Sequence, residues 1–261
     1  MVPKKLSYSL LACKPRVLHG ALTGSICYLV YCSQEPILSL RLNDYNLSQV
    51  IIGCIFGINP LTYTISTVLI PYIVPRWMEH RVTMITGLYI LAISNLLIGP
   101  FFADKNLTSM LLGLAISGFS MGFNTIPNMP EMIIATVEAY PTCDLDHANS
   151  LLSGMLNAGF GSGQALGPIL GSLFYQLTSF RMTMNIISTM TAIYATLYLL
   201  TAKGCQAYSK TCKNFSERNL PEEQKTRSVA ESTEVDASYI FTIWYKLKYG
   251  EDEDGAKGDD N

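Results

Sequence analysis

The stretch TSMLLGLAISGFSMGFNTIPNMPEMIIATVE, residues 108–138, decides how this chain folds. It is longer than the ~20 residues that a helix needs to cross the hydrocarbon core of a bilayer. Its charged residues are Glu131, which directly follows Pro130, and Glu138 at its end. A carboxylate at membrane depth is costly and is retained for function, and a helix interrupted by proline at that depth lines a cavity. The stretch therefore predicts a membrane helix of a transporter.

One face of this predicted helix is polar. Asn124, Asn128, Glu131 and Glu138 follow one another at i, i+4, i+7 and i+14, which places them on one side of a helix. In lipid such a face must point into the protein or toward water. We expect Glu131 near the middle of the membrane as a proton-coupling carboxylate, and Glu138 at the cytoplasmic interface. The alternative is that Glu131 is a protonated, structural acid that hydrogen-bonds to a neighbouring helix.

Five further apolar segments have the length of membrane helices, at residues 17–38, 49–74, 82–102, 149–177 and 181–202. The composition agrees, because 49% of the residues are hydrophobic and 15% are charged, whereas soluble domains carry about 25% charged residues. We predict an all-α integral membrane protein whose residues 17–202 form six transmembrane helices in a lipid bilayer. Residues 1–16 are then a cytosolic segment, and residues 203–261 a cytosolic, acidic and mostly disordered tail.

The positions of lysine and arginine predict the orientation. On one side of the predicted membrane there are three positively charged residues, Arg41, Lys105 and Arg181. The other side has more: Lys4, Lys5, Lys14, Arg16, Arg76, Arg81, Lys203, Lys210 and Lys213. Because positive residues stay on the cytosolic side, both termini are expected in the cytosol. The net charge of −2 averages an apolar region and an acidic tail, and it predicts no nucleic-acid partner.

A second acid, Glu35, lies near the end of the first segment and precedes Pro36. This pair again predicts a helix break beside an acid, and the alternative is that Glu35 is an interfacial acid that reaches the lipid headgroups. Tyr28 and Tyr31 on the same segment are candidates for an aromatic wall around a cation, although tyrosines at such positions more often pack or anchor at the interface.

The fifth apolar segment carries a glycine at every fourth position. This pattern predicts a smooth face on which another helix packs closely, with no chemistry of its own. The expected packing motif consists of Gly159, Gly163, Gly167, Pro168 and Gly171.

Signatures of enzymes are missing from the sequence. It contains no Gly-x-Ser-x-Gly, His-Glu-x-x-His or Walker motif, and its three histidines are far apart. We expect no enzymatic activity, no cofactor and no metal site.

Three stretches resemble the second, C-terminal half of a major facilitator superfamily transporter, helices seven to twelve. Residues 163–171, GQALGPILG, resemble an antiporter-type motif of the eleventh helix, and residues 71–81 take the place of the loop between helices eight and nine. Residues 35–38, EPIL, resemble the Glu-Pro-x-Leu signature that closes the seventh helix in the vesicular amine transporter family. That family includes monoamine, acetylcholine and polyamine carriers.

This resemblance implies exchange of a cytosolic cationic amine for lumenal protons in a vesicular or other endomembrane. It implies that Glu35 lies at the amine site, with the proton on Glu131. Two departures stand out: the monoamine carriers have an aspartate near Asn124 in place of an acid at Glu131, and Pro75 stands where the superfamily loop prefers aspartate. The residues expected to bind the small cationic solute are Glu35, Tyr63, Asn124, Asn128 and Asn157.

A complete carrier of this kind has twelve helices and binds its substrate between two halves. We therefore expect a second six-helix half, in the same or another chain, as a partner. Two alternatives remain for the function. One is a facilitator for another small solute, in which the acids are structural. The other is a membrane protein that does not transport and acts as a scaffold or regulatory half.

Overall fold

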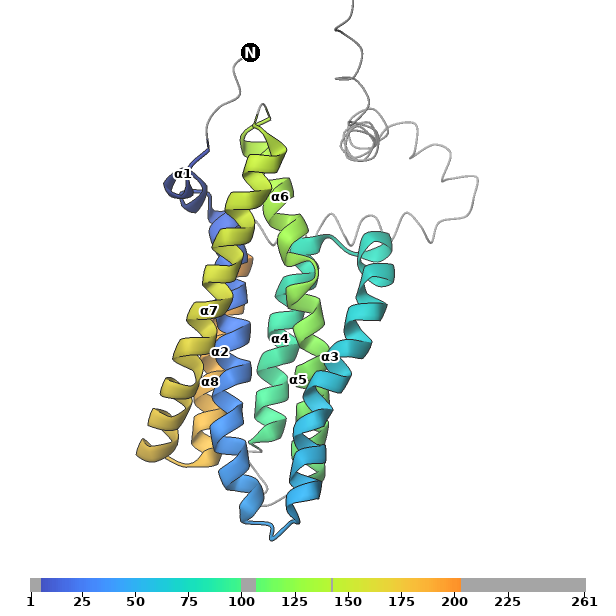
Figure 1. Ribbon diagram of the computed structural model, residues 1–261, viewed down its shortest axis with the longest axis vertical. Helices are drawn as coiled ribbons and strands as arrows, with labels where there is room; N and C mark the ends of the chain where they lie inside the picture. Colours follow the sequence, from blue (N-terminus) through green and yellow to red (C-terminus); the bar gives the residue numbers. More distant parts are fainter. Residues whose placement is uncertain (1–5, 100–106, 142, 203–261) are drawn as a thin grey trace, which may run out of the picture. The chain divides into compact units, whose positions relative to one another are not determined.

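The structure, a computed structural model, describes residues 6–99, 107–141 and 143–202, and within this range it leaves out the side chains of residues 73–77. All of these residues belong to one compact unit, residues 1–211, and the predicted disordered tail lies outside them. The regular structure of the described ranges is helical, and most of the helices run side by side (Figure 1). In chain order they are α1 (Tyr8–Ala12), α2 (Pro15–Asn43), α3 (Gln49–Trp77), α4 (His80–Ile98), α5 (Leu107–Thr125), α6 (Asn128–Ala139), α7 (Leu145–Leu177) and α8 (Phe180–Thr201).

Four helical stretches are long and apolar enough to cross a membrane: Gln49–Tyr72, His80–Ile98, Leu107–Ala139 and Phe180–Thr201. The other two long helices, α2 with 29 residues and α7 with 33, also exceed the length that a bilayer requires. The predicted fold class, an all-α membrane protein, is therefore confirmed.

The predicted interruption of residues 108–138 is also confirmed. α5 ends at Thr125, a turn covers Ile126 and Pro127, and α6 begins at Asn128. Pro127 and Pro130 lack the backbone N–H groups that would continue the helical hydrogen bonds through this point. The prediction of a break at Pro36 is wrong, because α2 continues through this residue.

Helix α4 lies in the interior of the bundle. Its side chains Met84, Ile85, Leu88 and Leu91 are fully buried and pack in one core cluster with residues of α2, α5 and α8. Helix α3, in contrast, buries few of its residues. α4 is therefore the interior element against which α5 and α8 pack.

The glycine face of α7 packs against the backbone of α2, as predicted. A Cβ atom built on Gly159, Gly163, Gly167 or Gly171 would lie 2.2–2.8 Å from a carbonyl oxygen of α2. These oxygens belong to residues 21, 25, 29 and 33, so the two helices remain in register over about three turns. Only glycine allows this approach, which brings α-carbon hydrogens close to carbonyl oxygens.

Replacing Gly163 with leucine is expected to destabilise the fold by about 1–3 kcal/mol, because the larger side chain forces α7 away from Ser25 of α2. Gly161 provides a matched control on the same helix, since a Cβ atom there meets nothing within 4 Å. The measurement is thermal unfolding of the purified protein in detergent. Equal melting temperatures for Gly163→Leu and Gly161→Leu would contradict a packing role for this face.

Candidate functional site

Glu35 and two tyrosines share one face of α2. Tyr28, Tyr31 and Glu35 follow one another at i, i+3 and i+7, which aligns them along the helix. The tyrosines are partly buried and pack, together with Tyr63 of α3, against the core cluster around α4. The ring of Tyr28 also meets that of Phe160 of α7, with the ring centres 4.7 Å apart. Aromatic side chains from three helices therefore border the face that carries Glu35.

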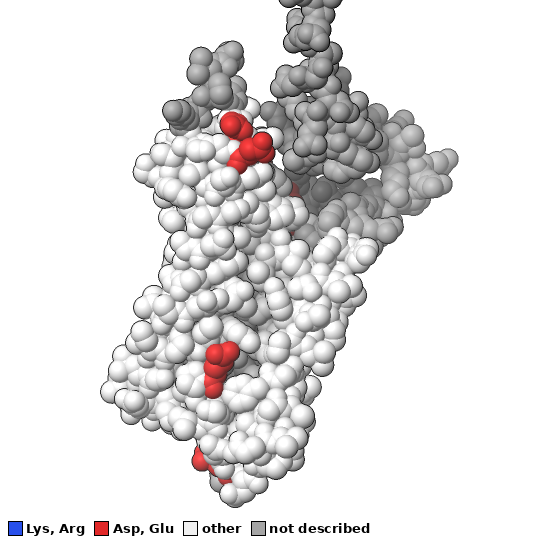
Figure 2. Space-filling model, viewed as in Figure 1, with Lys and Arg blue, Asp and Glu red and all other residues white. Residues whose placement is uncertain are grey.

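The Glu35 side chain is exposed, and it forms no ion pair with any other residue that the structure describes. Figure 2 shows that uncharged side chains cover most of the visible face and that acidic ones appear at its two ends and at one place between them. A carboxylate without a counter-charge on a membrane helix, beside aromatic faces, is suited to bind an organic cation.

Glu131 lies in a different environment. Its side chain is 4% exposed, and its Oε1 lies 2.7 Å from Nη2 of Arg16 and 3.2 Å from Nε of Arg81. Arg16 also contacts Glu138, and Arg81 lies 3.6 Å from Glu79. Both guanidinium groups contact the same carboxylate oxygen. Glu131 thus joins α6 to the first turns of α2 and α4.

This position differs from the expected one near mid-membrane. The two arginines that bind Glu131 are the second residues of α2 and α4, so the carboxylate lies toward the end where these helices begin. Glu35 follows Arg16 by 19 residues on α2, which separates the two levels by about 28 Å. Glu35 and Glu131 therefore belong to two separate sites and do not line one common cavity.

The structure places Asn124 and Asn128 between helices, away from the face that carries Glu35. Asn128 is fully buried, and its Nδ2 donates to Gly20 O of α2 at 3.0 Å. Asn124 is 1% exposed, and its Nδ2 donates to Ser120 O at 2.9 Å. The Oδ1 atoms of both have no hydrogen-bond partner among the described residues. Their role as substrate ligands stays a prediction.

The two remaining candidates are more accessible. Tyr63 is partly exposed and lies in the aromatic group described above, whereas Asn157 is exposed on α7. Arg16 and Arg81 were predicted as indicators of orientation and not as partners of Glu131. No local pattern links residues that are 115 and 50 positions away from Glu131.

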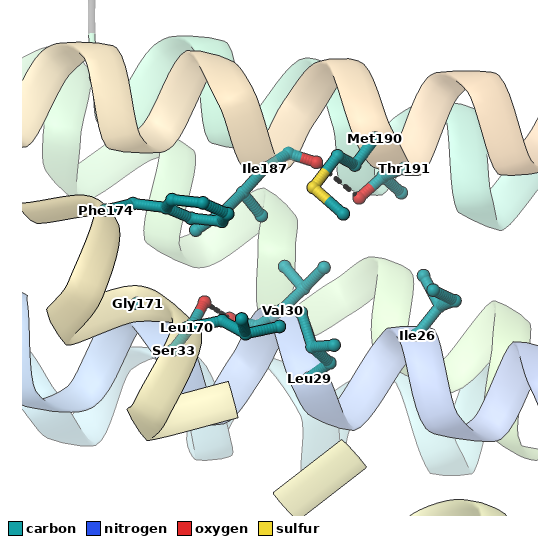
Figure 3. A pocket seen from close by; sticks show the side chains of 10 residues that line it. All are labelled: Ile26, Leu29, Val30, Ser33, Leu170, Gly171, Phe174, Ile187, Met190 and Thr191. Atoms are coloured by element: carbon teal, nitrogen blue, oxygen red, sulfur yellow. Dashed lines mark hydrogen bonds between the residues drawn. The ribbon is translucent and has the colours of Figure 1, made fainter. Parts of the chain in front are cut away.

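A crevice between α2, α7 and α8 is lined by uncharged side chains, which cannot pair with a charged ligand (Figure 3). Its polar side chains, Ser33 and Thr191, donate their hydroxyl hydrogens to the carbonyls of Val30 and Ile187 on their own helices. The other lining residues are Ile26, Leu29, Val30, Leu170, Gly171, Phe174, Ile187 and Met190. The crevice is therefore apolar and separate from both acids.

Comparisons with known proteins identify the family of the chain. The model of the Major Facilitator Superfamily matches residues 20–243. The chain is similar to "MFS-type transporter SLC18B1" of Mus musculus, with 29% identity over 68% of this chain and 40% of that protein. It is also similar to the Homo sapiens and Rattus norvegicus proteins of that name, each with 30% identity over 56% of this chain and 33% of theirs. The chain thus spans 40% or less of these relatives. The chain belongs to the Major Facilitator Superfamily, a family of multi-pass membrane transporters, which confirms the resemblance in its sequence.

Proposed function

We propose that this chain forms half of a proton-coupled antiporter for a cationic amine. The observation that carries this proposal is the exposed Glu35 carboxylate, without an ion-pair partner among the described residues and aligned with Tyr28 and Tyr31 on α2. The carboxylate supplies the counter-charge of an ammonium group, and the ring faces attract the same group through their quadrupoles. The resemblance of residues 35–38 to the vesicular amine transporter signature supports the same substrate class.

The separation of the two acids limits what this half recognises. Since Glu131 lies about 28 Å from the level of Glu35 and binds Arg16 and Arg81, it is not a second counter-charge for the same small amine. This half then recognises one ammonium group, with Tyr63 as a neighbouring contact. Asn157 lies two residues before Gly159, which packs on Ala21 of α2, so it is about 20 Å from the level of Glu35 and does not contact the same group. Further charges of a polyamine require acids of a second half.

Glu131 couples proton binding to the arrangement of helix ends. In its ionised form it holds Arg16 of α2 and Arg81 of α4 together. A proton on Glu131 removes the charge that both arginines bind, which leaves them to Glu138 and Glu79. We propose that this exchange of partners loosens α6 from α4, while Glu138 of α6 keeps its contact with Arg16 of α2, and that the proton is released when Glu131 and Arg81 meet again.

A second six-helix half completes the carrier in this proposal. Helix α3 presents exposed apolar side chains, among them Val50, Leu61, Val68 and Tyr72. Cβ atoms built on Gly53 and Gly57 of the same helix meet nothing within 4 Å. Such a surface suits either lipid or close packing of another helix. The greater length of the relatives supports the second half.

Binding of labelled amines to the purified chain in lipid nanodiscs tests this proposal. We expect spermidine, serotonin or choline to bind and to be displaced by other organic cations, and a neutral sugar to have no effect. Displacement by neutral solutes would favour the alternative of a facilitator with structural acids. If no solute binds, and none is taken up when a complementary half is co-expressed, the scaffold alternative gains support.

The orientation makes a separate prediction. The exposed Cys13 precedes α2, and Asn46 lies in the turn between α2 and α3, so the two positions mark opposite ends of α2. With both termini in the cytosol, a thiol reagent that cannot cross membranes labels Cys13 from the cytosolic side. In a variant whose single cysteine results from Asn46→Cys, labelling is expected from the lumenal side of an endomembrane. The reverse pattern would show that the predicted orientation is inverted.

A further inference from the structure

Three consecutive residues of α2 point in three directions, because successive residues of a helix are turned by about 100°. Ser33 faces α7, where its Cβ atom is 2.9 Å from the position of a Cβ atom built on Gly171. Gln34 faces α4 and donates from Nε2 to Oδ1 of Asn95 at 2.9 Å. Glu35 faces neither helix and is exposed. The direction in which the Glu35 side chain points is therefore set by the contacts of Ser33 with α7 and of Gln34 with α4.

Ser33 contacts α7 and Gln34 contacts α4, and the second of these contacts, between Gln34 and Asn95, is polar. Gln34 is 3% exposed and Asn95 is 0% exposed, so water does not compete for their hydrogen bond. Asn95 in turn donates from Nδ2 to Leu91 O at 2.8 Å, which fixes its amide with Oδ1 toward Gln34. In a buried, apolar setting, breaking this contact leaves polar atoms without partners.

The position of Pro36 makes this contact important for Glu35. Proline has no N–H group, so the carbonyl of Cys32 loses its usual helical hydrogen bond at the turn that carries Glu35. α2 nevertheless stays helical there, and the residues next to the proline are held from outside by α4 and α7. A side-chain contact therefore supplies the constraint that the backbone lacks.

We propose that Gln34 and Asn95 are positioning residues of the amine site: their hydrogen bond holds the Glu35 carboxylate on the open face of α2. The use of this positioning rests on the proposed amine site at Glu35, whereas the geometry of the contact does not. It brings α4, a helix of the interior, into the construction of the site. The variants below separate it from a general packing role.

The test measures how fast a water-soluble carbodiimide with glycine ethyl ester modifies Glu35 in the full chain in nanodiscs, read by mass spectrometry. Asp44, whose side chain is 53% exposed near the same end of α2, is the internal reference. The variant Gln34→Leu/Asn95→Leu removes both amides and leaves neither unpaired. The exchange Gln34→Asn/Asn95→Gln keeps two amides facing each other. Ser188→Ala is the matched control, because Ser188 donates to Ala92 O of α4 at 2.7 Å and is also buried.

We expect the ratio of Glu35 to Asp44 modification to fall about threefold to tenfold in the double leucine variant, the range that the loss of one net hydrogen bond allows. The exchange variant is expected to restore the ratio, and Ser188→Ala to leave it unchanged. An unchanged ratio in the double leucine variant, or an equal fall in Ser188→Ala, would overturn the proposal. If the double variant does not fold, Gln34→Met is measured in its place with the same two outcomes.

A second arm separates this proposal from the proposed function. Choline, whose quaternary nitrogen cannot couple to an activated carboxyl, is added during the modification of the unsubstituted chain, and it is expected to protect Glu35 but not Asp44. If choline does not protect Glu35 while the variants behave as expected, the positioning role is supported and the amine site fails. If choline protects Glu35 and the variants have no effect, the amine site is supported and the positioning role is overturned.

Discussion

Glu131→Gln is expected to abolish amine uptake driven by a pH gradient while amine binding to the same protein survives. Glutamine keeps the shape and the hydrogen-bonding capacity of the side chain but cannot exchange a proton. If Glu131 is the coupling group, the arginine contacts at the ends of α2 and α4 then no longer respond to pH. The measurement compares uptake and equilibrium binding of a labelled amine in vesicles that contain the chain together with a complementary half.

The same variant is expected to lower stability, because Arg16 and Arg81 lose the carboxylate between them. Removing one partner of a buried ion pair costs about 3–5 kcal/mol, and water at this end of the bundle reduces that value. Glu138→Gln is the matched control, since Glu138 contacts the same Arg16 but is 58% exposed, and exposed pairs contribute about 0–1 kcal/mol. Equal, mild effects of both variants on stability, together with normal uptake by Glu131→Gln, would make Glu131 a structural acid and contradict the coupling mechanism.

The sequence allowed prediction of features whose cause is local. The break before Asn128 follows from two prolines three residues apart, and the close packing of α7 follows from glycines at every fourth residue. Even so, the glycine spacing did not identify α2 as the partner helix. That choice depends on how the helices pack, which the sequence of α7 alone does not contain.

Pro36 shows why the same local rule failed elsewhere. Pro127 and Pro130 remove two helical hydrogen bonds within one turn, whereas Pro36 is the only proline inside α2. Neighbouring helices support α2 on both sides of this point, through Gly171 and Asn95. Tertiary contacts therefore preserved a helix whose proline predicted a break.

The candidate site was also predictable only in part, because it too depends on contacts between distant parts of the chain. The polar stripe was predicted to face either the protein interior or water, and Asn124, Asn128 and Glu131 are buried in the interior. Its partners were not predictable, because Gly20, Arg16 and Arg81 come from distant parts of the chain. These partners place Glu131 nearer the first turns of α2 and α4 than its position in the apolar stretch indicated.

Glu35→Gln is expected to weaken amine binding, whereas Glu131→Gln is expected to abolish uptake and leave binding intact. The exposed carboxylate is the only counter-charge that the described part of α2 offers to a cation on this face. Its loss removes the attraction between opposite charges, while the aromatic contacts of Tyr28 and Tyr31 remain. Because the face is open to water, we expect a decrease in affinity of about tenfold to a hundredfold, less than the loss of a fully buried charge partner produces.

Isothermal titration of the purified chain with spermidine checks this expectation without a complementary half. Glu35→Asp is the control variant, because it keeps the negative charge and shortens the side chain; it is expected to retain most of the affinity. The Glu131→Gln protein serves as a second reference and is expected to bind spermidine as the unsubstituted chain does. Should Glu35→Gln bind spermidine as tightly as Glu35→Asp, the cation is held elsewhere, and the assignment of the amine site to this face of α2 is wrong.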